Sequence, residues 1–243
     1  MPNKIVVLAD SLSLPRTENM GNIRYEDTYP YLLDISLRGQ LGMNAPIVIE
    51  KGKRYRTITD VAADWNEYVS WRKPEIVVVQ VGITDCSPRV FSPSQRAFIG
   101  RIPVRFVREL LLKFVHKFRQ QIIAAFPPKV YTPLQQYRET IEKLVGLAKQ
   151  DGVLALVFVK IVRPLDSLES RSPGLQENVR LYNNVLDEIK SKPGVYVIEL
   201  SDLIHEHENA EDHIVDDGYH LSVQGNQLLA THLEHLVVRL LYT

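Results

Sequence analysis

Five short runs of hydrophobic residues, rich in valine and isoleucine, recur along the chain. They occupy residues 4–9, 46–50, 75–82, 153–161 and 195–200. Strands that are buried on both faces, as in a parallel sheet, have this nearly continuous apolar character, because both sets of alternating side chains meet a hydrophobic layer. The runs therefore predict five buried strands.

Segments with a helical spacing of apolar residues separate these runs. They cover residues 29–42, 57–74, 132–152, 172–194 and 222–241. Regular alternation of strands and helices is typical of an open, doubly wound α/β sheet. We expect a three-layer α/β/α sandwich with a five-stranded parallel sheet of the flavodoxin-like kind, forming a single domain over residues 1–243.

Composition excludes several classes of partner. Lys+Arg and Asp+Glu each number 29, so no overall charge attracts nucleic acid. Cys86 is the only cysteine, which rules out an intramolecular disulfide. The apolar run at the N-terminus is too short for the core of a signal peptide, and no later segment has the length of a transmembrane span. We expect a cytoplasmic location.

Two separate stretches carry candidate chemistry. In DDGYHLSVQG, at 216–225, Asp217 lies three residues before His220. An aspartate can hold one ring nitrogen of a histidine while the other accepts a proton from a nucleophile, although a capping Asp beside a surface His is the simpler alternative. Ser11 follows the first predicted strand, and the ligand crevice of such sheets lies at the carboxyl ends of the strands. Ser11, His220 and Asp217 therefore suit the roles of nucleophile, base and orienter.

These stretches resemble the first and last blocks of the SGNH (GDSL-type) hydrolases. That family has Gly-Asp-Ser after its first strand, where this chain has Ala9, Asp10 and Ser11, and its last block matches DGYHLSVQG. The resemblance spans the whole chain and implies a serine esterase, with His220 as general base, Asp217 as its orienter, and no metal or organic cofactor. The loops also resemble a bacterial subgroup associated with surface-polysaccharide synthesis genes, which suggests an O-acyl group, such as acetyl, on a carbohydrate.

The same resemblance implies an oxyanion hole built from Ser11, Gly52 and Thr84. The backbone amides of Ser11 and Gly52 would donate to the oxyanion, with Lys53 or Arg54 as an alternative source of the second amide. Where the family has Gly-x-Asn-Asp, this chain reads GITD at 82–85, so Thr84 replaces the asparagine. Loss of one such donor can cost about 3–4 kcal/mol of transition-state stabilisation.

Two arginines are candidates for substrate binding. Arg16 and Arg89 each follow a proline in a loop expected to face the crevice. Arginine binds carboxylate, phosphate or sulfate groups well, although a structural ion pair with a nearby acid is the alternative. Asp85 is a third substrate-binding candidate, with a role in the turn as its alternative.

Residues 89–129 predict a basic helical elaboration of the sandwich. Glu109 is the one acidic residue among eight basic ones between Arg89 and Arg119. Apolar residues recur there at helical spacing, at Val104, Val107, Leu111, Phe114, Val115, Phe118 and Ile122. The simplest interpretation is a helix whose apolar stripe packs on the domain; contact with a membrane surface, a partner or a second copy of the chain, and a lid over the crevice, are alternatives.

Two other functions fit these residues. An O-acyltransferase would use the same triad, because transfer and hydrolysis differ only in whether an alcohol or water accepts the acyl group. A weakly active or non-catalytic binding module of a polysaccharide-synthesis complex is the second, since Ala9 and Thr84 depart from the family pattern. The histidine-containing run 205–213 lacks a recognised ligand spacing, so we expect no metal site. The expected partner is a small-molecule or carbohydrate ester.

Overall fold

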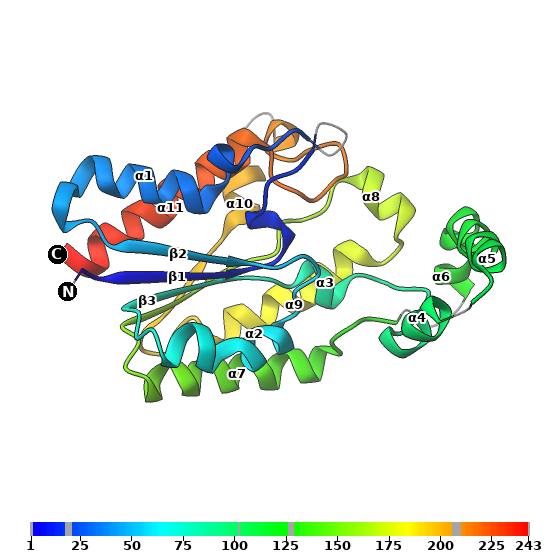
Figure 1. The fold of residues 1–243 in the computed structure, drawn as a ribbon, viewed down its shortest axis with the longest axis horizontal. Coiled ribbons are helices and arrows are strands. Elements are labelled where there is room, and N and C mark those ends of the chain that lie inside the picture. The colour runs from blue at the N-terminus through cyan, green and yellow to red at the C-terminus, as the bar shows by residue number, and fades with distance from the viewer. Residues whose placement is uncertain (1, 18–20, 102, 126–128, 206–209, 243) are drawn as a thin grey trace.

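A five-stranded sheet forms the centre of the computed structural model, which describes residues 2–17, 21–101, 103–125, 129–205 and 210–242 (Figure 1). Its strands are β1 (Lys4–Ala9), β2 (Ile47–Gly52), β3 (Ile76–Gln80), β4 (Ala155–Val159) and β5 (Val195–Ile198). All neighbouring strands are parallel, in the order β2-β1-β3-β4-β5. The predicted five-stranded parallel sheet is thus confirmed, and its order is the flavodoxin-like one.

Helices and short helical turns connect the strands. The helices are α1 (Tyr29–Leu41), α2 (Ile58–Trp65), α3 (Ile83–Cys86), α4 (Pro93–Gly100), α5 (Arg105–Lys117), α6 (Arg119–Ala125), α7 (Leu134–Gln150), α8 (Asp166–Arg171), α9 (Leu175–Ile189), α10 (Leu200–His205) and α11 (Val223–Tyr242). The turns are η1 (Ser11–Ser13), η3 (Tyr25–Asp27), η4 (Gly42–Asn44), η5 (Asn66–Ser70) and η6 (Ala210–His213). The helix predicted over 57–74 is shorter than expected, because α2 passes into the π-helical turn η5 at Asn66.

Both faces of the sheet are covered, as the apolar strands require. Val6 and Leu8 of β1 point into the layer formed by α2, α7 and α9, whereas Ile5 and Val7 point into the layer formed by α1, α10 and α11. Figure 1 shows these two helical layers on opposite sides of the strands. The alternation follows from the two-residue period of a strand and explains why β1 is apolar throughout.

The reversal in strand order places the crevice of the sheet beside β1. The chain continues from β1 to β2 on one side and returns to β3 on the other, so the segments after β1 and β3 diverge at their carboxyl ends. In open α/β sheets this switch point is where ligands bind. The segment after β1 carries Ser11, and the segment after β3 carries Thr84.

The basic segment 89–129 extends away from the sheet as a helical arm made of α4, α5 and α6 (Figure 1). Its two ends meet at the base, where the backbone N–H of Arg89 donates to the carbonyl of Lys129 at 2.7 Å. Arg119 ties the arm to the rest of the molecule, since its guanidinium donates to the carbonyl of Pro88 and to the Ser172 hydroxyl.

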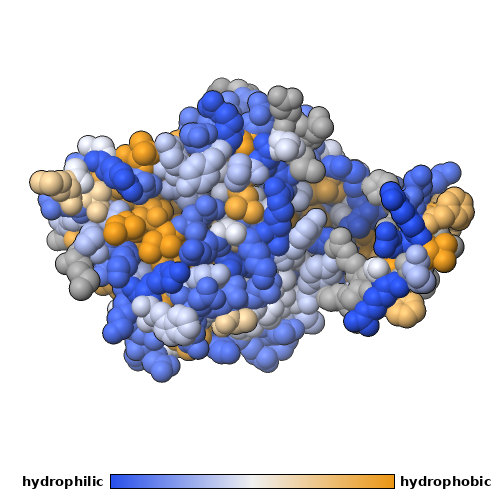
Figure 2. All heavy atoms as spheres, in the orientation of Figure 1, coloured by the Kyte–Doolittle hydropathy of each residue, from blue (hydrophilic) through white to orange (hydrophobic). Residues whose placement is uncertain are grey.

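The predicted apolar stripe of the arm is only partly covered, since Val115, Phe118 and Ile122 are half-buried. Val104 and Phe114, both members of the predicted stripe, are 54% and 57% exposed, and Phe106 and Leu110 are more than half exposed as well. In Figure 2 the lobe formed by the arm displays hydrophobic and hydrophilic spheres side by side. The physical reason is the position of α5, which projects beyond both helical layers and so lacks a neighbour along one side. No helix in the described part of the chain is both long and apolar enough to span a bilayer.

Candidate active site

The turn after β1 presents Ser11 at the carboxyl edge of the sheet. Asp10 follows β1, and its carboxylate accepts the backbone N–H of Leu12 at 3.0 Å, which closes a tight turn. The second carboxylate oxygen of Asp10 is buried and has no hydrogen-bond partner among the described residues. Burial raises the pKa of Asp10 to about 7, because the charged form loses its hydration.

Ser11 lies against a histidine from the other end of the chain. Its Oγ is 2.9 Å from Nε2 of His220, and Nδ1 of His220 is 2.6 Å from a carboxylate oxygen of Asp217. The imidazole is 2% exposed. Both ring nitrogens are thus engaged by the predicted partners, in the arrangement that lets a histidine accept a proton from a hydroxyl.

The turn that carries Asp217 and His220 is fixed by its own backbone. One carboxylate oxygen of Asp217 accepts the N–H groups of Tyr219 and His220, at 3.2 and 3.1 Å, which leaves the other oxygen for the ring. Gly218 between them has a φ of +92°, and a Cβ there would stand 2.8 Å from Cβ of Leu168. The short Asp-x-x-His spacing therefore works because glycine supplies the left-handed bend.

Electrostatics keep this histidine neutral and this aspartate charged. Burial lowers the pKa of His220 below its usual 6.5, against the opposing effect of Asp217 and with help from the charges of Arg16 and Arg54. Burial by itself would raise the pKa of Asp217, but the hydrogen bond and charge of His220 hold it below 3.8. A neutral imidazole facing a hydroxyl at neutral pH is the protonation state that a general base needs.

Arg16 does not occupy the predicted substrate-binding position. Its Nη2 lies 3.2 Å from the carboxylate oxygen of Asp217 that also faces His220, and its side chain is only 7% exposed. Arg16 instead forms a structural ion pair, which was the alternative to substrate binding, and Asp217 is the acid. Arg16 is therefore a candidate for positioning the Asp217–His220 pair.

A pocket of about 140 Å³ opens in front of Ser11. Its lining residues are Ser11, Tyr55, Ile83, Thr84, Ser87, Arg89, Arg119, Leu168, Ser172, Leu175 and Tyr219. The structure thus brings together three of the predicted site residues, Ser11, Thr84 and Arg89. The Thr84 hydroxyl makes no hydrogen bond with any residue that the structure describes, so it is available to a ligand.

Gly52 lies beside the nucleophile turn but not among the residues that line this pocket. It pairs with Ala9 at the end of β2, and a Cβ on Gly52 would be 2.4 Å from the hydroxyl of Ser13. Only glycine therefore allows the turn after β1 to approach so closely. Of the two alternative donors, the amide of Lys53 is already used, because it donates to the carbonyl of Ala9 at 3.0 Å.

The prediction that Asp85 binds substrate is wrong in this structure. Asp85 is fully buried, and its carboxylate accepts the backbone N–H of Ile58 and the hydroxyl of Thr132. Burial raises the pKa of Asp85 to about 7. Asp85 instead caps the start of α2 and joins it to the segment before α7, which is the turn role named as its alternative.

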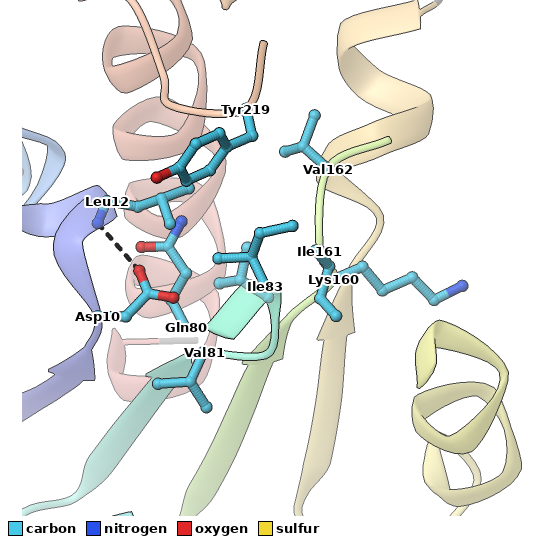
Figure 3. Close-up of a pocket in the computed structure, with 10 residues that line it drawn as sticks. Asp10, Leu12, Gln80, Val81, Ile83, Lys160, Ile161, Val162 and Tyr219 are labelled. Carbon is cyan, nitrogen blue, oxygen red and sulfur yellow. Dashed lines mark hydrogen bonds between the residues drawn. The ribbon is translucent and has the colours of Figure 1, made fainter. Parts of the chain in front are cut away.

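A second, smaller cavity adjoins the pocket (Figure 3). It has a volume of about 20 Å³, enough for roughly one water-sized group. Figure 3 shows Tyr219 and Leu12 above it, Asp10 and Gln80 at the strand ends, and apolar side chains such as Ile83 along the wall. Tyr219 and Ile83 line both spaces, so the cavity lies next to Ser11 and is mainly apolar.

Eight of the eleven residues that line the pocket were not predicted as site residues, and Arg119 and Tyr219 are the two of these whose side chains bear most on the chemistry. Arg119 lies at the start of α6, and nothing in the helical pattern of the arm distinguishes it from the other basic residues there. Tyr219 lies inside the Asp-x-x-His block, where its position next to His220 was the available signal. Of the run 205–213, residues 206–209 lie outside the described chain; the described residues contain no group that could hold a metal ion.

Comparisons with known proteins agree with the fold. Residues 16–228 match the model of the GDSL-like lipase/acylhydrolase family, a span that includes Asp217 and His220 and begins after Ser11. No curated protein matches the sequence. A lipase/acylhydrolase from Enterococcus faecalis is 16% identical over 97% of this chain and 95% of its own, with a TM-score of 0.68. A catalytic mutant of an acetylxylan esterase from Geobacillus stearothermophilus is 17% identical over 100% and 96%, with a TM-score of 0.60.

The solved structures are too distant in sequence to show more than a shared fold, whereas the family model covers most of the chain. The chain belongs to the GDSL-like lipase/acylhydrolase family and is a hydrolase.

Proposed function

We propose that the protein is a serine esterase in which Ser11, His220 and Asp217 form a catalytic triad. Ser11 Oγ attacks the acyl carbon while its proton passes to Nε2 of His220. The C–O bond of the ester then breaks, and the departing alcohol takes that proton. Water, deprotonated by His220, releases the acid and returns the serine hydroxyl.

The contact of 2.9 Å between Ser11 Oγ and His220 Nε2 carries this proposal. It joins residues that are 209 positions apart in the sequence, so local chain geometry alone does not account for it. The neutral state of His220 and the charged state of Asp217 are both those that the proposed mechanism uses.

The amides of Ser11 and Gly52 and the hydroxyl of Thr84 are the proposed oxyanion donors. Thr84 supports this role by facing the pocket beside Ser11 without another hydrogen-bond partner among the described residues. Donors of this kind stabilise the negative charge that develops on the carbonyl oxygen.

The proposed substrate is a short acyl ester, such as acetyl, on a carbohydrate. The small apolar cavity beside Ser11 favours a short acyl group. The similar Geobacillus enzyme acts, by its name, on acetylxylan, and its two catalytic mutants replace an aspartate and a histidine three residues apart, the spacing of Asp217 and His220.

Hydrolysis of p-nitrophenyl acetate and of acetylated sugars by the wild type and by Ser11→Ala tests the proposal. We expect Ser11→Ala to lower kcat by at least ~10³-fold, with unchanged thermal unfolding, while the exposed Ser170→Ala keeps wild-type rates. Esters of octanoate should be poorer substrates than acetates. Full activity in Ser11→Ala would refute the assignment.

A further inference from the structure

The pocket in front of Ser11 has an unbalanced charge. Arg89 and Arg119 line it, and no aspartate or glutamate does. Burial and then the charge of Arg89 lower the pKa of Arg119, so the two guanidiniums are close enough to repel each other. Two like charges at the wall of one pocket are stabilised when an anion binds between or beside them.

Neither guanidinium is neutralised by an acid within the described chain. Arg89 stacks on the ring of Tyr131 at 4.8 Å, and its Nε is buried with no hydrogen-bond partner among the described residues. Among the described residues, Arg119 donates to two neutral oxygens, the carbonyl of Pro88 at 2.9 Å and the hydroxyl of Ser172 at 2.8 Å.

Arg89 and Arg119 are half-buried, and the more deeply buried side chains of Arg56 and Arg16 show the contrast. Arg56, 2% exposed, pairs with Asp64 at 2.6 Å, and Arg16, 7% exposed, pairs with Asp217 at 3.2 Å. Desolvated cations normally have such partners, because an uncompensated charge is costly to bury. The partner of the pocket pair is thus expected to arrive with the ligand.

We propose that Arg89 and Arg119 form an anion subsite and that the esterase substrate carries a carboxylate, phosphate or sulfate group near its acyl ester. The inference rests on the proposed function, since it places this group in the pocket where Ser11 acts. Planar guanidiniums bind such oxyanions through paired hydrogen bonds. Within the proposed carbohydrate class, the substrate is an acylated acidic sugar rather than a neutral one.

The test compares matched esters on the wild type, Arg89→Gln and Arg119→Lys. The substrates are the acetyl esters of a neutral hexoside, of the corresponding uronate and of the corresponding sugar phosphate. They differ only in the anionic group. We expect the wild type to prefer at least one of the anionic esters by kcat/KM, and Arg89→Gln to lose ~10–100-fold on that ester but less than about threefold on p-nitrophenyl acetate. Arg119→Lys keeps the positive charge and a donor for Pro88 and Ser172, so its loss of kcat/KM on the anionic ester should be smaller. The exposed Arg38→Gln is the matched control.

Equal losses on neutral and anionic esters, or no anionic preference in the wild type, would overturn the subsite. A failure of the subsite is distinguishable from a failure of the esterase: in the first case p-nitrophenyl acetate hydrolysis still depends on Ser11, and in the second it does not. Comparing the uronate with the phosphate identifies which anion the subsite accepts.

The arm carries an independent inference about a surface. Phe106, Leu110 and Phe114 recur every four residues on α5, so they share one face, and they are 73%, 57% and 57% exposed. The exposed Lys113 and Lys117 lie on the same side of the helix, seven residues after Phe106 and Leu110 respectively.

We infer that this apolar and basic face of α5 binds an anionic lipid surface. An amphipathic helix with a basic rim buries its apolar side among lipid tails while its cations meet anionic headgroups. The basic excess of the arm disfavours a second copy of the chain as the occupant, because two such surfaces repel.

Co-sedimentation with vesicles of phosphatidylglycerol and phosphatidylcholine tests this surface. We expect binding to the mixed vesicles and little to pure phosphatidylcholine. Binding should be at least ~10-fold weaker in the double variant Phe106→Ser, Phe114→Ser and in the double variant Lys113→Glu, Lys117→Glu. The charge reversal Arg38→Glu, on α1, is the control. Absence of vesicle binding, or self-association that the serine variant abolishes, would overturn the lipid assignment.

Discussion

At the scale of single residues, Arg16 offers a test of how the triad is tuned. It contacts Asp217, and its charge helps to lower the pKa of His220. The active base is the neutral imidazole, so in the wild type the acid limb of the kcat/KM profile should have its midpoint below pH 6.5. In Arg16→Gln the pKa of His220 rises, so this limb should move to higher pH, with kcat lowered roughly tenfold by poorer orientation.

The measurement is a pH profile of p-nitrophenyl acetate hydrolysis for both proteins, with Arg38→Gln as control. An unshifted acid limb in Arg16→Gln would show that the ion pair with Asp217 is only structural.

Thr84 tests the proposed oxyanion donor. Thr84→Val keeps the shape of the side chain and removes the hydroxyl, so we expect kcat to fall ~10–100-fold with little change in KM. Thr84→Ser keeps the donor and should retain most activity. The measurement is kcat and KM of the two variants. Equal activity of the valine and serine variants would exclude the Thr84 hydroxyl as an oxyanion donor.

Asp10 should make stability depend on pH. Its folded pKa of about 7 exceeds the value of 3.8 expected when it is unfolded, so its contribution is fully present below about pH 4 and is lost as pH rises through 7. The asparagine of Asp10→Asn is neutral at every pH. The decrease in the free energy of unfolding over that range should therefore be smaller, by on the order of 2–4 kcal/mol. Urea unfolding at several pH values measures this, with exposed Asp202→Asn as control; an unchanged pH dependence in Asp10→Asn would contradict the assignment.

At the scale of elements, the start of α1 is held by α11. The side chain of Asn226 accepts the N–H of Tyr29 at 2.9 Å, and both residues are buried. Asn226→Ala leaves that donor unsatisfied, so we expect a loss of about 1–3 kcal/mol in the free energy of unfolding. Denaturant unfolding measures the loss, and Gln227→Ala, exposed on the same helix, is the control. Equal stability of the two variants would contradict the capping role.

All five predicted strands are present, because strands buried on both faces leave a direct apolar signal in the sequence. The helical arm was predicted, but its direction was not. Periodicity defines an apolar face on α5 and does not say what covers it, so packing on the domain was the default expectation. The structure meets it only in part, because Phe114 is exposed whereas Val115 is half-buried.

At the scale of the whole molecule, the topology of the sheet explains why the site could be predicted in part. In open parallel sheets ligands bind at the carboxyl ends of the strands, which predicts that the turn after β1 lies at the crevice. The Asp-x-x-His spacing identifies the pair that contacts Ser11. Arg119 could not be predicted in this way, because its place in the pocket depends on how the arm packs against Ser172, to which Arg119 donates. The pairing of Arg16 with Asp217 is likewise a contact across 201 residues.

The central claim is that His220 activates Ser11 as a nucleophile. Labelling with a fluorophosphonate probe, followed by peptide mass spectrometry, tests it most directly in the wild type, Ser11→Ala and His220→Ala. The account predicts one labelled residue, Ser11, in the wild type and loss of labelling in both variants while each remains folded. Labelling that persists in folded His220→Ala at the wild-type rate, or that falls on another serine, would contradict it.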